Sequence, residues 1–307
     1  MSDRDPHATE MKTCPICGSG EIGLRFYGFT NRNPSDGKRW PVFECLSCRH
    51  GFINPQPDAE VLSEYYNACY PAYTAKHGAE HDDDSATIAK ARSARQFRHI
   101  PIPAGKRVLD FGCGGGFFLN ICRQLGAEVQ GIEPSRHGAK TARQQGLAVF
   151  EGSLEDFLDQ HGDERFDVIT SNHVIEHVPD PVKTLSDLRQ LLAAGGTMTI
   201  AVPNARSVFA NALGAEWYNT DLPFHLHQFS VDSLRIAAEK AGLATVEIST
   251  TSLPSSTAAS LQLLLRRKYY VPQRLSRRLP MMQRHSEKLA LRQDARSEGE
   301  ALLGRFS

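Results

Sequence analysis

The sequence lacks the features by which a chain enters or crosses a membrane. It contains no apolar run near the ~18 residues that a membrane-spanning helix needs. Its first residues, Met1 to Asp5, are polar and do not form the apolar core of a signal peptide. The seven cysteines are not spaced as a disulfide framework. These absences favour a cytoplasmic protein over a secreted or membrane-embedded one.

An excess of charge of one sign is also missing. In 307 residues, 35 Lys and Arg balance 35 Asp and Glu, so the formal net charge is zero. A neutral chain is not drawn as a whole to nucleic acid, so nucleic acid is not expected as a partner. The stretch 266–307 departs from this balance and is basic. Such a run usually forms a solvated helix face, with an anionic acceptor, a membrane surface or nucleic acid as the alternative partners.

The complete glycine pattern of dinucleotide-binding proteins is absent too. An apolar run ends in Asp110-Phe-Gly112-Cys-Gly114, but Phe117 stands where the third glycine of Gly-x-Gly-x-x-Gly should be. A glycine turn still lets the backbone approach a ligand closely. Glu133, at the end of the next apolar run, suits a ribose diol. We therefore expect a nucleoside-bearing cofactor other than NAD, with the Asp110 carboxylate near a cationic group.

Apolar runs of strand length alternate with helical segments from residue 107 onward. This alternation predicts an α/β fold, with a parallel sheet and helices on both faces. The expected strands lie near 107–112, 128–133, 147–150, 166–171, 197–202 and 244–250. The expected helices lie near 117–126, 135–145, 153–160, 181–194 and 231–241. Gly195-Gly196 is expected to end the fourth helix, and the segment 260–265 fits either a strand or a helix.

The order of these motifs resembles the class I S-adenosylmethionine-dependent methyltransferases. Asp-x-Gly-x-Gly with a downstream acid resembles their first motif. Further segments resemble the family in the expected order: 131–135, 152–156, 166–178 and 191–204. The resemblance spans about 105–250 and implies a Rossmann-like sheet that binds S-adenosylmethionine; the alternative is a Rossmann-like domain with another cofactor. The implied cofactor-binding residues are Asp110, Gly112, Gly114, Glu133, Pro134, Ser153, Leu154 and Asn172.

Four of the cysteines form two Cys-x-x-Cys pairs, Cys14 with Cys17 and Cys45 with Cys48. This spacing is typical of a zinc ribbon. Four thiolates close a tetrahedral shell around Zn²⁺ and leave no position for water, so the metal should be structural. A small unit with little core would gain much of its folding energy from the metal. The alternatives are a redox pair or unrelated free thiols.

The predicted domains resemble bacterial methyltransferases of sugar, surface-polysaccharide or natural-product pathways. The predicted domains of this chain are a disordered tail (1–12), a zinc ribbon (13–57), a helical linker or lid (58–104), the S-adenosylmethionine-binding domain (105–265) and a basic, mostly helical or flexible tail (266–307). Sugar C-methyltransferases carry a further domain that this chain is too short to contain, so C-methylation of a nucleotide sugar is not expected. Linker tyrosines Tyr65, Tyr66, Tyr70 and Tyr73 should pack the linker on the cofactor domain, or else form an acceptor lid.

Methyl transfer to a hydroxyl requires the protein to position the acceptor and remove a proton. Histidine suits this role at neutral pH. The candidate catalytic residues are His173, Glu176, His177, His225 and His227. We favour His177 and His225; one of His225 and His227 should be structural. Glu176 and His177 could instead begin a helix and orient the turn.

Residues His173-x-x-Glu176-His177 with a later histidine also resemble the metal site of metal-assisted O-methyltransferases, with a histidine in place of the first glutamate. Without assuming that metal, the sequence predicts O-methylation of a small-molecule or sugar-containing acceptor. One alternative is methylation of RNA or protein, which the neutral charge and the lack of an Asn/Asp-Pro-Pro-Tyr motif at Asn172 disfavour. Another is a non-catalytic S-adenosylmethionine-binding subunit. The sequence leaves the oligomeric state open.

Overall fold

The computed structural model describes residues 10–30, 37–66, 104–252 and 298–307, and the single positions 258, 288 and 292. The described residues fall into two compact units. The first lies within Met1–Ala75, Pro203–Leu234 and Ser249–Leu302, and the second within Lys76–Val202, Arg235–Ile248 and Leu303–Ser307. The predicted ribbon belongs to the first unit. The segment 203–234, which was expected inside the cofactor domain, is part of the ribbon's unit instead.

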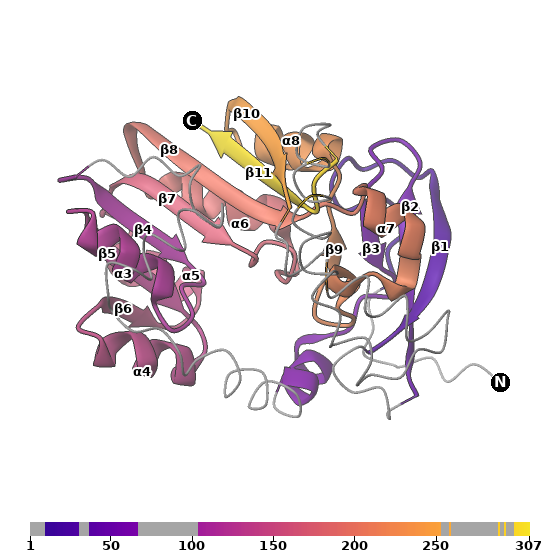
Figure 1. Cartoon of the computed structure of the whole chain (residues 1–307), viewed down its shortest axis with the longest axis horizontal. Coiled ribbons are helices and arrows are strands. Elements are labelled where there is room, and N and C mark those ends of the chain that lie inside the picture. The colour runs from indigo at the N-terminus through magenta and orange to yellow at the C-terminus, as the bar shows by residue number, and fades with distance from the viewer. Residues whose placement is uncertain are drawn as a thin grey trace. The chain divides into compact units, whose positions relative to one another are not determined.

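A four-stranded antiparallel sheet carries the ribbon (Figure 1). Its strands, in spatial order, are β1 (Ile22–Phe29), β2 (Arg39–Cys45), β3 (Gly51–Ile53) and β9 (His227–Gln228). The strands β1 and β2 pair antiparallel. The register between them shifts between Leu24 and Phe26, so Arg25 is the extra residue of a β-bulge.

The linker helix packs on the ribbon side. Residues 59–66 are helical, and Tyr65 joins a core that includes the buried Trp40. The ring of Tyr65 lies 5.5 Å from the Trp40 ring, and the ring of Tyr66 lies 5.0 Å from that of Phe224. Both partners belong to the first unit. These tyrosines therefore pack the linker onto the ribbon unit, whereas Tyr70 and Tyr73 lie outside the described residues.

The second sheet confirms the predicted Rossmann-like α/β fold. Its spatial order is β10-β11-β8-β7-β4-β5-β6 (Figure 1). The strands are β4 (Arg107–Phe111), β5 (Glu128–Glu133), β6 (Ala148–Glu151), β7 (Phe166–Asn172), β8 (Leu192–Pro203), β10 (Thr245–Thr251) and β11 (Ala301–Phe306). The pairs β4–β5, β4–β7, β5–β6 and β7–β8 are parallel. Their carboxyl ends consequently meet at one edge, where open α/β sheets bind ligands.

Helices connect the parallel strands, close to the predicted positions. They are α3 (Phe117–Gln124), α4 (Arg136–Gln144), α5 (Leu154–His161) and α6 (Pro181–Gln190), followed by α7 (Val208–Leu213) and α8 (Val231–Lys240). The side chains of Ser135, Ser153 and Asp180 accept backbone N–H groups at the starts of α4, α5 and α6. Two short 3₁₀ turns, Gly214–Glu216 and Tyr218–Thr220, follow α7.

Two expectations about chain segments are wrong. Gly195-Gly196 does not end a helix: α6 ends at Gln190, and the glycines lie within β8, where the pairing with β7 jumps from Leu192 to Thr197. Such an irregularity accommodates extra residues in a strand. The end of the predicted basic tail is not helical or flexible either. Residues 301–306 form β11 between β10 and β8, because their apolar side chains are buried there. The segment 260–265 lies outside the described residues.

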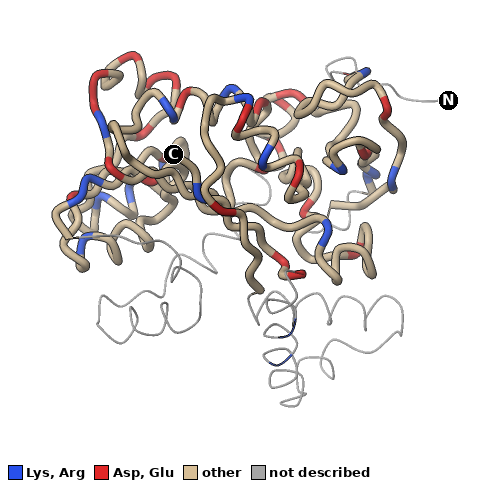
Figure 2. Tube along the Cα trace, turned by 90° about the horizontal axis from the view of Figure 1, so that it is seen from above, with Lys and Arg blue, Asp and Glu red and all other residues tan. Residues whose placement is uncertain are grey.

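None of the helices in the described ranges is long and apolar enough to cross a membrane. Charges of both signs are interspersed along the same part of the chain (Figure 2). This agrees with the balanced composition. Most of the basic run that begins at residue 266 is outside the described residues, so its role stays a prediction.

Candidate functional site

The turn after β4 is built from glycines in the left-handed region. Gly112 has φ 73° and Gly114 has φ 56°, values that side chains disfavour. A Cβ on Gly112 would lie 2.3 Å from Cγ2 of Val174, so packing requires a glycine there. A Cβ on Gly114 would have no atom within 4 Å. The Gly114 backbone therefore borders open space in which a ligand can approach closely.

Glu133, at the end of β5, is 5% exposed and is held by two backbone amides. Its Oε2 accepts a hydrogen bond from Gly114 N at 2.8 Å, and its Oε1 accepts one from Ser135 N at 2.8 Å. Burial raises the pKa of this carboxyl, and the two amides partly offset the rise. Each oxygen retains a lone pair for a further donor. The carboxylate is thus fixed in orientation and can accept further hydrogen bonds.

Asp110 is the next-to-last residue of β4 and is 3% exposed. Burial raises the pKa of its carboxyl to about 7, against the hydrogen bond that Thr170 Oγ1 donates at 2.6 Å, and the charge of nearby Glu133 adds to the rise. Asn172 Nδ2 is close to this carboxyl and buried, but it makes no well-formed hydrogen bond. Two neighbouring carboxyls and a spare donor fit a ligand with both a cationic group and an acceptor atom, as S-adenosylmethionine has.

The remaining predicted cofactor residues border the same sheet edge. Pro134 directly follows β5, and Ser153 and Leu154 begin α5 after β6. The hydroxyl of Ser153 donates to Asp156 Oδ2 at 2.6 Å and accepts from Asp156 N at 3.1 Å, so this side chain caps the helix. The structure therefore groups Asp110, Gly114, Glu133 and Asn172, while it uses the side chain of Ser153 locally.

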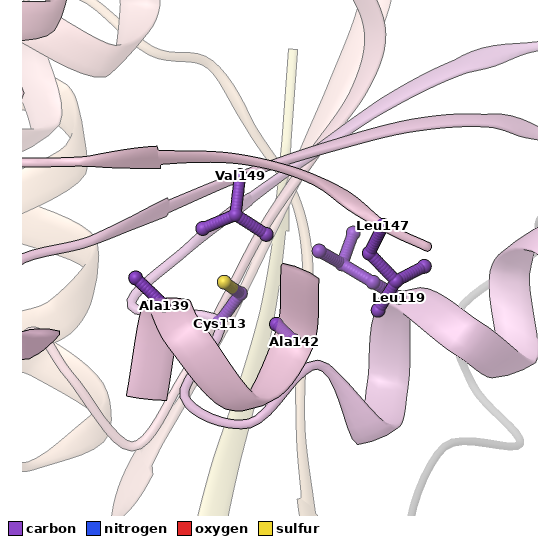
Figure 3. Close-up of a cluster of buried hydrophobic side chains, with 6 residues drawn as sticks. All are labelled: Cys113, Leu119, Ala139, Ala142, Leu147 and Val149. Carbon is purple, nitrogen blue, oxygen red and sulfur yellow. The ribbon is translucent and has the colours of Figure 1, made fainter. Parts of the chain in front are cut away.

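Gly131 and Thr170 support the site as strand neighbours of Asp110, but neither stood out for this role in the sequence. Asp110 pairs with Gly131 on one side and with Thr170 on the other. A Cβ on Gly131 would lie 2.5 Å from Cys113 Sγ, so this glycine makes room for the turn. Cys113 packs below the turn in a buried cluster with Leu119, Ala139, Ala142, Leu147 and Val149 (Figure 3). Only the strand pairing reveals these neighbours.

The segment after β7 carries three candidate catalytic residues. His173 has φ 56°, and its Nδ1 lies 3.3 Å from Oε1 of the fully buried Glu176. The backbone amide of His177 donates to Val174 O at 2.9 Å. The segment is a turn, and α6 starts only at Pro181, so Glu176 and His177 do not begin a helix. The metal site suggested for this motif stays a prediction.

His225 lies in the segment 217–230 between α7 and α8, which we call the insertion, and is 8% exposed. Its Nδ1 lies 2.7 Å from the backbone oxygen of Asn219. A carbonyl oxygen only accepts, so Nδ1 carries the proton and donates it. In the neutral ring the lone pair is then on Nε2. His225 consequently presents the tautomer that a base needs, with Asp221 Oδ2 3.9 Å from Nε2.

His227 lies in β9 and is 1% exposed. Its Nδ1 is 3.0 Å from His50 Nε2, and His50 Nδ1 is 3.3 Å from Ser233 Oγ. Burial lowers the pKa of His50 well below its usual value, and the adjacent His227 lowers it further. The two rings therefore form a buried hydrogen-bonded pair, with His50 directly before β3 and His227 in β9. Of the two histidines in the insertion, His227 fits the structural role.

The four cysteines of the ribbon meet in space. The Sγ atoms of Cys14, Cys17, Cys45 and Cys48 all lie within 4.8 Å of one another. The Cys14–Cys48 separation is 3.6 Å and the Cys17–Cys45 separation is 3.5 Å. Tetrahedral zinc with Zn–S bonds of about 2.3 Å would place its sulfurs roughly 3.8 Å apart. The donor set therefore fits one zinc ion.

Each cysteine pair sits on a similar turn. In the first, which we call the Cys14–Gly18 turn, Gly18 N donates to Cys14 O at 3.0 Å. In the second, the Cys45–Arg49 turn, Arg49 N donates to Cys45 O at 2.9 Å. Gly18 has φ 83° and Arg49 has φ 62°. The two turns thus share one backbone design, although only the first places glycine at its left-handed position.

The thiols also favour a cation electrostatically. A hydrogen bond from Cys48 lowers the pKa of Cys14 to about 5, whereas the same contact raises the pKa of Cys48. Burial raises the pKa of Cys17. One thiolate therefore forms readily, and its negative charge disfavours the ionisation of a second thiol. A bound divalent cation removes this opposition, because it stabilises all four thiolates together.

Comparisons with known proteins agree with this geometry. A family model described as a methyltransferase domain matches residues 84–248, more than half of the chain. The ubiquinone biosynthesis O-methyltransferase of Cereibacter sphaeroides strain KD131 is 38% identical over 159 residues, which cover 48% of this chain and 64% of that protein. Its namesake from Aromatoleum aromaticum is 36% identical over 160 residues, which cover 47% and 67%. The match thus spans less than two thirds of the first relative.

Solved structures show the same fold at low identity. A SAM-dependent methyltransferase from Archaeoglobus fulgidus has a TM-score of 0.50 and 18% identity, and the match covers 77% of this chain and 98% of that one. The [4+2]-cyclase SpnF has a TM-score of 0.53 and 16% identity, covering 82% and 96%. The fold alone therefore does not fix the reaction, which must be argued from the site.

Proposed function

The chain belongs to the S-adenosylmethionine-dependent methyltransferases, and on that premise we propose that it methylates a hydroxyl group of a small-molecule or sugar-containing acceptor. The observation that carries the cofactor assignment is the grouping of Glu133, Gly114 and Asp110 at the carboxyl edge of the sheet. The names of the curated relatives support oxygen as the methylated atom.

The described residues fit S-adenosylmethionine at complementary points. Glu133 would accept the ribose hydroxyls, because two amides hold its oxygens and leave lone pairs available. Asp110 would lie near the cationic part of the cofactor, whose charge offsets the repulsion between the two carboxyls. Asn172 Nδ2 would find the acceptor that it lacks. When bound, the cofactor supplies an electrophilic methyl group whose leaving group is its own thioether.

We propose His225 as the base that takes the proton of the acceptor hydroxyl. The Asn219 carbonyl fixes its tautomer and so leaves the lone pair on Nε2. His227 is fixed through both β9 and His50, which supports a positioning role for it. His173, Glu176 and His177 would shape the segment after β7, where the fully buried Glu176 holds the ring of His173.

The zinc ribbon is proposed to be structural. Four cysteine thiolates would complete the coordination shell, which leaves no open position for a substrate or water. The ribbon sheet includes β9, so zinc would also stabilise the segment that precedes α8. The metal would thereby hold the insertion that carries His225 without taking part in methyl transfer.

One experiment separates this proposal from its alternatives. The full chain is incubated with S-adenosylmethionine, labelled on the methyl group, and an extract of the source cells, which is then divided into small-molecule, RNA and protein fractions. We expect the label in the small-molecule fraction. Label in RNA or protein would contradict the proposal. Cofactor binding without transfer to any fraction would indicate a non-catalytic subunit.

A further inference from the structure

Three arginines converge on one buried carboxylate in the ribbon unit. Glu44, on β2, is 7% exposed. Its Oε2 lies 3.3 Å from Arg25 Nε, and its Oε1 lies 3.0 Å from Arg49 Nε and 2.5 Å from an η nitrogen of Arg206. Within the described ranges, Glu44 is the acidic side chain that pairs with all three. One carboxylate cannot balance three guanidinium groups, so two positive charges remain.

Two of these arginines occupy irregular backbone positions. Arg25 is the extra residue of the bulge between β1 and β2, and bulges redirect side chains. Arg49 holds the left-handed position of the Cys45–Arg49 turn, where the other turn has Gly18. A left-handed conformation is unfavourable for arginine and free for glycine. The backbone alone therefore favours glycine at position 49. Interactions of the Arg49 side chain must account for the arginine.

The cluster also has hydrogen-bond donors to spare. Arg206 Nε is buried and has no hydrogen-bond partner. Other nitrogens are used internally: Arg25 donates to Ala205 O at 3.3 Å, and Arg206 donates to Arg49 O at 3.2 Å. Each guanidinium has five N–H donors, which these contacts only partly occupy. The side chain of Arg49 is 51% exposed, so the cluster is open to solvent.

Repulsion within the cluster is not fully offset. Burial lowers the pKa of Arg25, and the charge of Arg206 lowers it further, against the opposing effect of Glu44. An anion placed among the guanidinium groups would relieve this repulsion. Arginine forks bind tetrahedral oxyanions through paired hydrogen bonds, which makes a phosphoryl group the best match.

We propose that Arg25, Arg49 and Arg206 form a binding site for a phosphoryl group. The group is either a free inorganic anion or part of an organic phosphate. The site lies in the ribbon unit and does not depend on the proposed methylation.

The test uses the zinc-loaded full chain and isothermal calorimetry with inorganic diphosphate. The variants Arg49→Gly and Arg206→Gln each remove one guanidinium. The control Arg39→Gln removes an exposed arginine of the same strand as Glu44, which stacks over Tyr27 outside the cluster. We expect wild type and the control to bind alike, and the two variants to bind at least about tenfold more weakly.

A second titration with uridine diphosphate distinguishes the sources: tighter binding than inorganic diphosphate indicates an organic phosphate, and equal binding indicates a free anion.

The glycine variant keeps the test decisive if Arg206→Gln fails to fold. Glycine is relaxed at the φ of Arg49, so zinc content and the unfolding temperature should not fall. Undiminished diphosphate binding in Arg49→Gly, or no binding by wild type at millimolar concentrations, would overturn the proposal. A marked fall in unfolding temperature without any change in binding would also overturn it, because Arg49 would then be purely structural.

Discussion

The Glu133 carboxylate accepts a hydrogen bond from the Gly114 amide at 2.8 Å, which joins the end of β5 to the turn after β4. The two residues are 19 positions apart in the chain. The bond orients the acid that suits a ribose, and it orders the turn that faces open space. The parts of the proposed cofactor site therefore hold one another in place.

Replacing Glu133 with Gln should weaken S-adenosylmethionine binding. An amide has one oxygen, so one of the Gly114 and Ser135 N–H groups would face an NH₂ group instead of an acceptor. We expect a loss of about tenfold to a hundredfold in affinity by calorimetry. Glu128→Gln is the matched control, since Glu128 begins the same strand and its side chain is 71% exposed. Affinity within twofold of wild type in Glu133→Gln would refute this site.

Cofactor affinity should rise with pH up to about 7 and then level off. The pKa of Asp110 is raised to about 7, so the carboxyl is protonated below that pH. A nearby cation on the ligand favours the charged form, so binding at lower pH must release a proton. Titrations from about pH 5.5 to about pH 8.5 measure this slope. Asp110→Asn should bind more weakly and show a flat profile; a wild-type affinity independent of pH would contradict the role of Asp110.

The same substitution should stabilise the ligand-free protein at alkaline pH. Because the folded pKa of Asp110 exceeds the unfolded one, folding binds a proton between about pH 4 and pH 7, and stability falls as pH rises through that window. Asparagine has no charge to bury. The gain in unfolding free energy should be about 2–4 kcal/mol near pH 8 and close to zero near pH 4. Denaturant unfolding at both values tests the sign, and a loss of stability at pH 8 would show that the ionised carboxylate is stabilising.

Zinc binding should depend on each cysteine of the ribbon. Cys14→Ser removes one of the four clustered thiols, so zinc content measured by atomic absorption should fall from about one ion per chain toward zero. The ribbon should unfold at lower denaturant concentration. Cys122→Ala is the control, because Cys122 is a buried thiol of α3 outside the cluster. Full zinc content in Cys14→Ser would be incompatible with the four-cysteine shell.

Kinetic measurements should distinguish the roles of the two histidines of the insertion. His225→Gln should lower kcat by about 10²–10⁴-fold while cofactor affinity is unchanged, since only proton removal is lost. His227→Gln should mainly lower the unfolding temperature, because it breaks the contact with the fully buried His50. Equal kcat for wild type and His225→Gln would show that another group is the base.

The sequence predicted the elements that have a periodic apolar pattern and the sites that have a characteristic spacing of reactive residues. Alternating apolar runs located β4 to β8 and the helices between them, since burial imposes those periods. The spacing of Cys14, Cys17, Cys45 and Cys48 located the ribbon. Other features depend on long-range pairing. The short strands β3 and β9 carry too few residues for a pattern, and β11 joins the sheet far from its sequence neighbours.

The site was predicted to a similar degree. Asp110, Gly114 and Glu133 follow from their local motifs, but the hydrogen bond from Thr170 appears only when β7 is placed beside β4. The arginine cluster was not foreseen, because Arg25, Arg49 and Arg206 share no motif and meet only through a bulge and two turns. Their convergence is a property of the folded ribbon unit.

The nature of the bond that the enzyme makes tests the proposed O-methylation most directly. The product formed with S-adenosylmethionine carrying ¹³C in its methyl group would be isolated from the small-molecule fraction and examined by NMR. We predict a methyl resonance bonded to oxygen, and less of this product with Glu133→Gln when the cofactor concentration is limiting. A methyl group on carbon or nitrogen would contradict the proposed O-methylation, and a labelled product that the Glu133 variant forms as well as wild type would contradict the proposed cofactor site.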